Sequence, residues 1–334
     1  MRIGLAGLGR IGAFHARTLT DLAAVDSLVV ADAVPEVTDR VSRSVGAEPA
    51  PSPDALLRSG IDGLVVAAAT GAHPTLVRAA VDAGVPVFCE KPVAGTVDEA
   101  LRLRAELAGR DARVQVGFPR RFDAAFVAAR AAVESGELGR VHTVRSTTLD
   151  PAPPPAAYLA VSGGIFHDCA IHDFDAVRWV TGRDVAEVYA TGDDGGDPVY
   201  TSIGDAHTVS SILTLDDGAL GVASNARCNA RGHDVRLEVH GTADSVAAGH
   251  DGGLPLRRAE PDAPAPGMPH TFFMDRLADA FRAELAAFTE VVAGKRPSPC
   301  TVADAVAASL VAEAATRSRR EHRPVRVDEV ENRE

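Results

Sequence analysis

The feature that most constrains the fold of this chain is a glycine-rich turn close to its first residue. Gly7-Leu8-Gly9-Arg10-Ile11-Gly12 follows a short apolar run, residues 2–6, and precedes a segment with helical periodicity, residues 10–22. In a strand–turn–helix unit such glycines permit a tight turn, close approach of the backbone to a pyrophosphate and close packing of the helix on the strand. The helix N-terminus adds unpaired N–H groups and partial positive charge. The pattern therefore predicts a dinucleotide-binding turn, with cofactor contacts from Gly7, Gly9, Arg10, Ile11 and Gly12.

An acidic residue follows the next apolar run and bears on the choice of cofactor. The run covers residues 27–31 and ends at Asp32, twenty residues after Gly12. A carboxylate at that place accepts hydrogen bonds from both ribose hydroxyls of NAD and repels the 2′-phosphate of NADP. NAD is therefore the predicted cofactor, and NADP is the less favoured one.

The first third of the chain alternates strand and helix patterns, which is typical of βαβ units and a parallel sheet. The predicted strands cover residues 2–6, 27–31, 62–68, 85–89 and 113–117, and the predicted helices cover 10–22, 34–44, 73–83, 96–108 and 122–135. We therefore predict an α/β fold whose first domain, residues 1–120, is a doubly wound parallel sheet of the Rossmann type.

The pattern changes after residue 120. Predicted strands at 140–149, 185–192, 207–215, 219–227 and 235–240 follow one another, with a helix at 167–181 among them and two long helices at 274–293 and 301–319. Asp216-Asp217-Gly218 between two of these strands is a hairpin signal. The second domain, residues 121–334, is thus predicted to be α+β with a mainly antiparallel open sheet. Three Pro- or Gly-rich loops, 150–157, 192–204 and 249–269, are either lids or variable surface loops.

Composition excludes several classes of protein. The chain has 334 residues, 46% apolar and 24% charged, and a net charge of −12. Such a charge disfavours nucleic acids and anionic membranes as partners. The four cysteines are scattered without a Cys-x-x-Cys pair, so no zinc ribbon or disulfide framework is predicted. With no membrane-spanning run and no signal sequence, the cytoplasm is the expected location.

Lysine is rare enough here to be informative. Of 34 Lys and Arg residues only Lys91 and Lys295 are lysine, and Lys295 lies in a polar turn. A retained lysine suits a place that needs a compact ammonium with an adjustable pKa. Lys91 follows the strand 85–89, at the end where open α/β sheets bind ligands.

Other strands of the first domain end in candidate residues at the same edge of the sheet. Thr70 and His73 follow the strand 62–68, Glu90 follows 85–89, and Pro119 follows 113–117. All four are predicted cofactor contacts. For His73 a second interpretation remains open, since its side chain could instead cap the helix that begins there.

A carboxylate and an imidazole lie one helical turn apart in the second domain. Asp168 and His172 are four residues apart in the predicted helix 167–181, which places them on one face. A carboxylate that orients an imidazole is the arrangement that proton abstraction from a hydroxyl requires. On an ordinary helix such a pair is more often a surface pair or a cap. A metal site is the poorer alternative, because no third ligand lies nearby in sequence, and no metal is predicted.

Four stretches taken in order resemble the Gfo/Idh/MocA oxidoreductases over essentially the whole chain. They are the glycine turn, Glu90-Lys91-Pro92, residues 117–123 and the segment from Gly163 to Asp175. Within the family the sequence is most similar to inositol 2-dehydrogenases. The resemblance implies an NAD(P)-dependent dehydrogenase with Lys91, Asp168 and His172 as catalytic trio, assembled as a dimer or tetramer on the open face of the second sheet.

This resemblance leads to a specific expected reaction, oxidation of a secondary hydroxyl of a cyclic polyol, with myo-inositol giving 2-keto-inositol. The three catalytic residues would touch the reacting hydroxyl, and Arg120, Asp150 and His233 are weaker candidates for the other hydroxyls. The pattern departs from the inositol enzymes at Pro119, His167 and His233, which bears on the substrate more than on the reaction. The alternatives are another sugar, an amino-, keto- or nucleotide sugar, or a non-catalytic NAD-binding sugar sensor.

Overall fold

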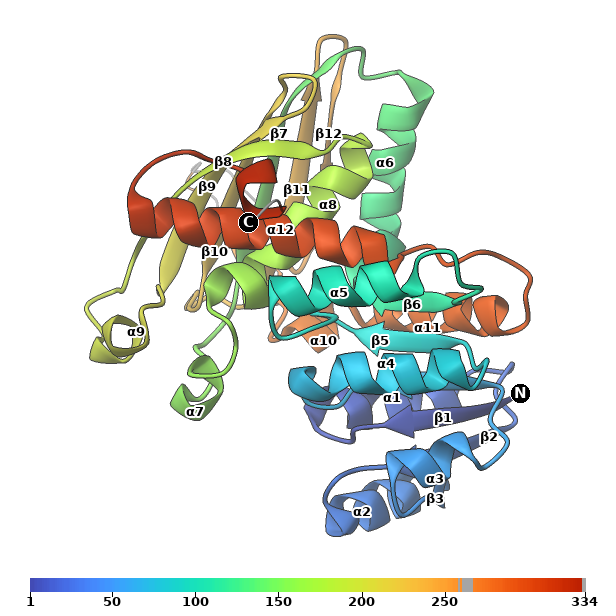
Figure 1. Ribbon diagram of the computed structural model, residues 1–334. Helices are drawn as coiled ribbons and strands as arrows, with labels where there is room; N and C mark the ends of the chain where they lie inside the picture. The colour runs from blue at the N-terminus through green and yellow to red at the C-terminus, as the bar shows by residue number, and fades with distance from the viewer. Residues whose placement is uncertain (258, 260–266, 332–334) are drawn as a thin grey trace. The chain divides into compact units, whose positions relative to one another are not determined.

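The computed structural model describes residues 1–257, 259 and 267–331. The chain divides into two compact units. Unit 1 comprises Met1–Pro119 and Phe281–Val306, and unit 2 comprises Arg120–Ala280 and Ala307–Glu334. Each unit is built around one β-sheet (Figure 1).

Unit 1 contains a six-stranded, fully parallel sheet with the strand order β3-β2-β1-β4-β5-β6. Its strands are β1 (Arg2–Ala6), β2 (Ser27–Ala31), β3 (Glu48–Pro49), β4 (Gly63–Val66), β5 (Val87–Glu90) and β6 (Val114–Gly117). Every residue of β4, β5 and β6 is buried, as expected for strands covered on both faces. The strand order reverses at β1, and the carboxyl edge at such a reversal is where open sheets bind ligands. The predicted doubly wound sheet is confirmed; the two-residue β3 was not predicted.

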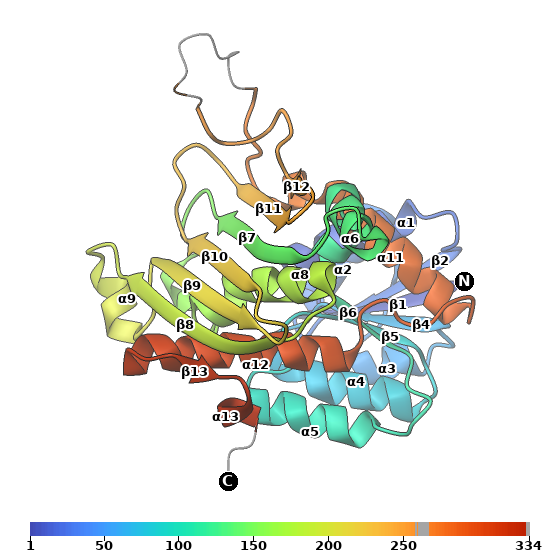
Figure 2. The ribbon, with the colours of Figure 1, turned by 90° about the horizontal axis from the view of Figure 1, so that it is seen from above.

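Helices lie on both faces of this sheet (Figure 2). They are α1 (Arg10–Thr20), α2 (Pro35–Val45), α3 (Pro53–Leu57), the 3₁₀ turn η1 (Thr70–Ala72), α4 (His73–Asp82), α5 (Val97–Leu107) and α11 (Ala278–Val292). Local signals explain several ends: Ser52 and Thr96 cap α3 and α5 with their hydroxyls, and Gly46 ends α2 in the left-handed conformation.

A segment near the end of the chain completes the core of unit 1. The sequence-based division assigned residues 281–306 to the second domain, whereas in the structure they belong to unit 1. Phe288 and Val291 of α11 are fully buried and share one apolar cluster with Ile3 and Leu19. Loss of a buried aromatic side chain of this kind costs about 3–5 kcal/mol of stability. Periodicity identified the helix, but it carries no information on which sheet the helix covers.

Unit 2 contains a seven-stranded sheet with the order β12-β11-β7-β10-β9-β8-β13. Its strands are β7 (Val141–Leu149), β8 (Val185–Asp193), β9 (Thr208–Leu215), β10 (Leu220–Ala226), β11 (Asp234–Gly241), β12 (Ser245–Ala248) and β13 (Val325–Arg326). The neighbours pair antiparallel except β7 and β10, which run parallel. A helical crossover after β7 leads to β8, and two reversals then bring β10 beside β7. The mainly antiparallel sheet is confirmed, as is the hairpin at Gly218, whose φ is +85°.

One face of this sheet is covered by helices. Those of unit 2 are α6 (Ala124–Ser135), α7 (Ala156–Leu159), the π-helical turn η3 (Phe166–Ala170), α8 (Ile171–Thr181), α9 (Pro198–Ile203), α10 (Phe273–Arg276), α12 (Val302–Glu321, which begins in unit 1) and α13 (Asp328–Glu331), with the 3₁₀ turn η2 (Pro119–Phe122) at the junction. Helix α8 packs against β7 and β10 (Figure 2). The predicted helix 274–293 is interrupted at Leu277 into α10 and α11. The loop at 192–204 carries α9, and part of the loop 249–269 lies outside the described residues.

Candidate functional site

The glycine turn of unit 1 connects β1 to α1 with a geometry that only small residues allow. Gly7 has a φ of +90°, and a Cβ on it would lie 2.3 Å from the Ala68 backbone. A Cβ on Gly12 would lie 2.0 Å from the Gly7 carbonyl oxygen. Gly9 precedes α1 without a side-chain cap, and a Cβ there would meet no other described atom within 4 Å. The turn is thus tight on its inner side and open at the N-terminus of α1, which fits a bound pyrophosphate.

Asp32 is held against this turn. Its carboxylate accepts hydrogen bonds from the Leu8 N–H (2.6 Å) and from the Val34 N–H (3.0 Å). The Asp32 N–H donates to the Thr38 hydroxyl (2.9 Å), and the side chain is half-buried. The N–H groups of Leu8 and Val34 therefore orient the Asp32 carboxylate towards the glycine turn. That position, at the carboxyl end of β2, suits a group that accepts ribose hydroxyls.

His73 connects two loops at the carboxyl edge of the sheet. Its Nδ1 lies 2.8 Å from the Pro92 carbonyl oxygen and its Nε2 lies 3.0 Å from that of Ala68, and the residue is 1% exposed. His73 is the first residue of α4, and the residue before it, Ala72, forms no side-chain cap. The ring thus joins the end of β4 to the Glu90-Lys91-Pro92 segment. Thr70 lies in the η1 turn between them.

A buried contact with helix α1 holds the Glu90-Lys91-Pro92 segment in place. Glu90 ends β5, and its carboxylate lies 2.5 Å from Nε2 of His15, a fully buried residue of α1. The bond between Lys91 and Pro92 is cis. Lys91 is half-buried, directly after the buried Glu90. The lysine was predicted from its sequence context, but the contact with His15 was not, because a histidine on the inner face of a periodic helix carries no further signal.

In unit 2, a buried ionic network surrounds the start of α8. Arg120 is 3% exposed; it donates to the Asp173 carboxylate (2.7 Å) and to the Thr148 hydroxyl (2.5 Å). Asp173 also accepts from Asn225 (2.6 Å). Arg121 forms a second buried pair with Asp175 (2.6 Å). These contacts give Arg120 a structural role, so its proposed part in substrate binding stays a prediction. Pro119, one residue earlier, is buried.

Asp168 lies in η3 and His172 in the first turn of α8, so the chain runs from π-helix to α-helix between them. The two oxygens of Asp168 have separate partners: Oδ1 accepts from the Tyr158 hydroxyl (2.8 Å) and Oδ2 from the Arg227 guanidinium (2.5 Å). The Asp168 side chain is 14% exposed. The predicted helix is confirmed, whereas its first turn was expected to be α-helical. The orienting role of Asp168 towards His172 stays a prediction.

Asp150 and His233, the two weaker candidates of this unit, lie together. Nδ1 of His233 is 3.5 Å from the Asp150 carboxylate. His233 is 2% exposed, and neither ring nitrogen has a hydrogen-bond partner within the part of the chain that the structure describes. Asp150 also acts electrostatically on Cys169, as do Asp168 and Arg227, so these groups form one cluster.

The charges in this cluster shift two ionisation equilibria. Burial raises the pKa of the Cys169 thiol, and the Asp150 and Asp173 carboxylates raise it further. Burial, the largest single effect, would lower the pKa of Arg227, but the charge and hydrogen bond of Asp168 together with the Cys169 and Asp205 side chains outweigh it, and the net shift is upward. Cys169 is therefore a neutral packing residue, and Arg227 stays a cation. Arg227 and Tyr158 were not predicted, because a lone arginine at the end of a strand and a tyrosine just after a Pro-rich loop carry no recognisable pattern.

Among the described residues, no group of three or more His, Cys, Asp or Glu side chains is arranged to hold a metal ion. No helix in the described ranges is long and apolar enough to cross a membrane.

Comparisons with known proteins cover both units. Residues 1–118 match the model of an oxidoreductase family with an NAD-binding Rossmann fold, and residues 126–247 match the Gfo/Idh/MocA C-terminal domain. The myo-inositol 2-dehydrogenase of Thermotoga maritima is 35% identical, and the match covers 99% of each chain. A myo-inositol dehydrogenase of Streptomyces leeuwenhoekii is 39% identical over 94% of this chain and 96% of its own. The structure of scyllo-inositol dehydrogenase from Lactobacillus casei with bound NAD(H) and scyllo-inositol has a TM-score of 0.89 at 27% identity, covering 98% of both chains.

Proposed function

The chain belongs to the Gfo/Idh/MocA family of NAD-binding oxidoreductases, and from this premise we propose that it is a cytoplasmic dehydrogenase that oxidises myo-inositol to 2-keto-inositol. The observation that carries the proposed substrate class is the buried His233 beside Asp150. Its two ring nitrogens lack partners among the described residues, and a carboxylate lies 3.5 Å away. A polar group buried without a hydrogen bond is costly, and the hydroxyls of a cyclic polyol would satisfy it. The inositol dehydrogenases among the relatives support the same class.

The proposed roles follow from the chemistry of each side chain. His172 accepts the hydroxyl proton as the adjacent carbon loses a hydride, and Asp168 orients the imidazole and balances its positive charge. Lys91 donates to the same oxygen and stabilises its developing negative charge. NAD, when bound, supplies the hydride acceptor. The residues that would hold it are those of the glycine turn, together with Asp32, Thr70, His73, Glu90 and Pro119.

A substrate panel tests this function. The purified protein is incubated with NAD and, in separate reactions, with myo-inositol, scyllo-inositol, aldoses and amino sugars, while NADH absorbance is recorded. We expect turnover with at least one inositol at a kcat/KM well above that of any aldose or amino sugar in the panel. Turnover of an aldose or amino sugar alone would contradict the substrate, and NAD binding without any turnover would favour the alternative of a sugar sensor.

The cofactor preference is expected to depend on Asp32. A carboxylate beside the 2′-phosphate of NADP costs Coulomb energy and two ribose hydrogen bonds, about 2–3 kcal/mol or roughly 10²-fold in kcat/KM. Asp32→Ser should therefore weaken NAD use and admit NADP, with Arg10 of the glycine turn as the proposed partner of the phosphate.

Asp32→Asn is the matched control for this experiment. Its amide keeps one oxygen, which can accept from either the Leu8 N–H (2.6 Å in the native chain) or the Val34 N–H (3.0 Å), and it removes the charge together with the second acceptor. The quantity to compare is kcat/KM for both cofactors in the three proteins. Equal use of NADP by the wild type would show that Asp32 does not face the ribose.

We also propose that the open face of the second sheet joins copies of this chain into a dimer or tetramer. Tyr189, Ile212 and Val222 lie opposite one another on β8, β9 and β10, and Leu220 lies on the same face. Tyr189, Ile212 and Leu220 are 40%, 51% and 47% exposed. Exposed apolar side chains gathered on one sheet face favour association. Ile212→Glu should lower the molar mass measured by light scattering, whereas Val127→Glu, a similarly exposed site on α6, should not; an unchanged mass for Ile212→Glu contradicts this interface.

A further inference from the structure

Arg227 is a buried arginine whose guanidinium meets the proposed catalytic carboxylate. It follows β10 directly, and its side chain is 1% exposed. Nη1 donates to Oδ2 of Asp168 (2.5 Å), and Nη2 lies 3.5 Å from Oδ2 of Asp205. A buried guanidinium with an ionic partner at this distance is a strong, directional donor. Arg227 therefore constrains both the position and the charge of Asp168.

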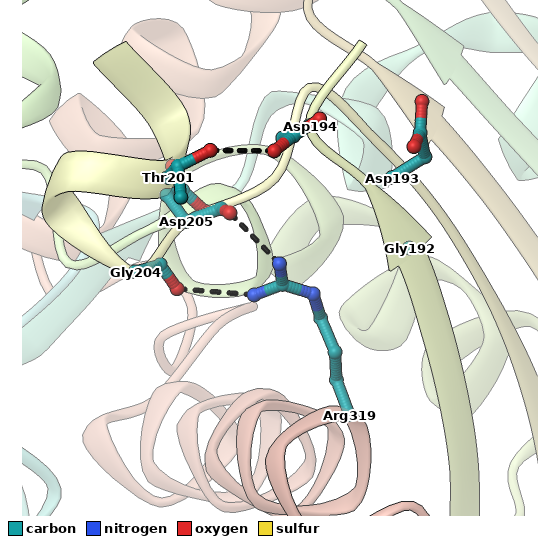
Figure 3. Close-up of a pocket in the computed structure, with 7 residues that line it drawn as sticks. All are labelled: Gly192, Asp193, Asp194, Thr201, Gly204, Asp205 and Arg319. Carbon is teal, nitrogen blue, oxygen red and sulfur yellow. Dashed lines mark hydrogen bonds between the residues drawn. The ribbon is translucent and has the colours of Figure 1, made fainter. Parts of the chain in front are cut away.

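Asp205 ties Arg227 to the same segment that carries Asp168. Oδ1 of Asp205 accepts from the Ile165 N–H (2.9 Å), immediately before η3. Gly164 has a φ of +86°, and a Cβ there would lie 3.2 Å from Oδ1 of Asp205. Arg319 of α12 donates to the backbone carbonyls of Gly204 (3.0 Å) and Asp205 (2.8 Å), as Figure 3 shows. Hydrogen bonds thus connect Asp205 both to the start of η3 and to Arg227.

Two further carboxylates lie near Asp168, and a tyrosine donates a neutral hydrogen bond to it. The carboxylates of Asp150 and Asp173 both act on the adjacent Cys169, as Asp168 does, so three acidic groups share this part of unit 2. Asp173 is neutralised by Arg120 at 2.7 Å. Tyr158 donates a neutral hydroxyl to Oδ1 of Asp168. Neighbouring carboxylates disfavour one another's charged forms, and the Arg227 cation, in direct contact with Asp168, counteracts that effect.

We propose that Arg227, braced by Asp205, is the positioning residue that holds Asp168 ionised and correctly oriented for its work with His172. The inference rests on the proposed function, because it concerns the same proton-transfer site. Arg227 contacts Asp168, whereas the proton transfer and the stabilisation of the oxyanion are assigned to His172 and Lys91. Its removal should lower kcat while leaving NAD binding in unit 1 unchanged.

Three variants separate this role from a merely structural one. Arg227→Met removes the charge and is expected to lower kcat roughly 10²-fold, because Asp168 then lacks the buried partner that holds it in position. Arg227→Lys keeps the charge with a single contact and should recover most of that loss, leaving kcat about three- to tenfold below the wild type. Tyr158→Phe removes the neutral hydrogen bond from the same carboxylate and should cost less than tenfold. KM for NAD should stay within about twofold in all three.

A double variant adds a sharper readout. In Asp168→Asn the carboxylate is already neutral, so adding Arg227→Met should lower kcat by less than about threefold further. A purely structural role for Arg227 predicts that the two losses multiply. If Arg227→Met does not fold, as checked by thermal unfolding, Arg227→Lys alone decides: a reduced kcat with unchanged KM for NAD supports the proposal.

Two results would overturn the inference: wild-type kcat in Arg227→Met or Arg227→Lys, or losses of Arg227→Met and Asp168→Asn that multiply. Failure of the proposed function looks different. If the wild type oxidises another sugar of the panel but no inositol, the substrate proposal fails, and the same variants are compared on the sugar that is turned over.

Discussion

Replacing His172 by alanine is expected to lower kcat by roughly 10²–10⁴-fold, because the chain then lacks the group proposed to accept the hydroxyl proton. In the wild type, kcat/KM should fall as the pH drops, since an imidazolium cannot accept a proton. In the variant that acidic limb should flatten. Buried ion pairs of Asp173 and Asp175 with Arg120 and Arg121 fix the first turn of α8, so the fold should survive the change.

His167→Ala is the matched control for this variant. His167 lies five residues earlier and contacts Glu313 at 3.3 Å, and its removal should leave the pH profile unchanged. Asp168→Asn tests the second half of the pair, since it should keep the fold and lower kcat by roughly 10²-fold through loss of the orienting anion. Full activity of Asp168→Asn would refute the Asp–His mechanism. An acidic limb that persists in His172→Ala would assign the proton acceptor to another group.

Lys91→Met should lower kcat by roughly 10²–10³-fold while NAD binding survives, as loss of one donor to a developing oxyanion does. The structure gives a physical reason to expect a localised effect. Lys91 lies between Glu90, which His15 holds at 2.5 Å, and Pro92, whose carbonyl oxygen lies 2.8 Å from His73. The backbone on both sides is therefore fixed independently of the ammonium. Steady-state kinetics and NAD titration by fluorescence give the two quantities.

Lys295 offers a control with the same chemistry, because it is exposed and lies in a turn after α11. Lys295→Met should match the wild type in both measurements. Lys91→Arg should recover little activity, since the planar guanidinium of arginine places its charge and its donors at other positions than the lysine ammonium does. Near-wild-type kcat in Lys91→Met removes the lysine from the mechanism.

The fold was predictable from the sequence to the extent that its signals are local. The strand β1, the glycine turn and α1 carry their periodicity and turn chemistry in about twenty residues, and the structure has them where predicted. The hairpin at Gly218 is equally local. The two-residue strands β3 and β13 have no sequence signature, and the pairing of β7 with β10 depends on a crossover rather than on either strand. The destination of α11 was likewise set by tertiary packing.

The candidate site divides in the same way. Lys91, Asp168 and His172 belong to short motifs, so their positions could be singled out in advance. Their supports are separated from them by long stretches of sequence: Arg227 lies 59 residues from Asp168, and Glu90 lies 75 residues from His15. A pairing at such separation follows from topology, which single-sequence patterns do not encode. The orientation of the Asp32 carboxylate likewise depends on the backbone N–H groups of Leu8 and Val34, and Leu8 lies 24 residues earlier in the chain.

Because residues 281–306 belong to unit 1, this unit depends during synthesis on a segment made near the end of the chain. A ribosome adds roughly 5–20 residues per second, so the first 119 residues emerge many seconds before the helix that covers their sheet. Until then the apolar face formed by residues such as Ile3 and Leu19 has no α11 to bury it. The nucleotide-binding unit therefore cannot finish folding during synthesis of its own strands. Its completion waits for nearly the whole chain.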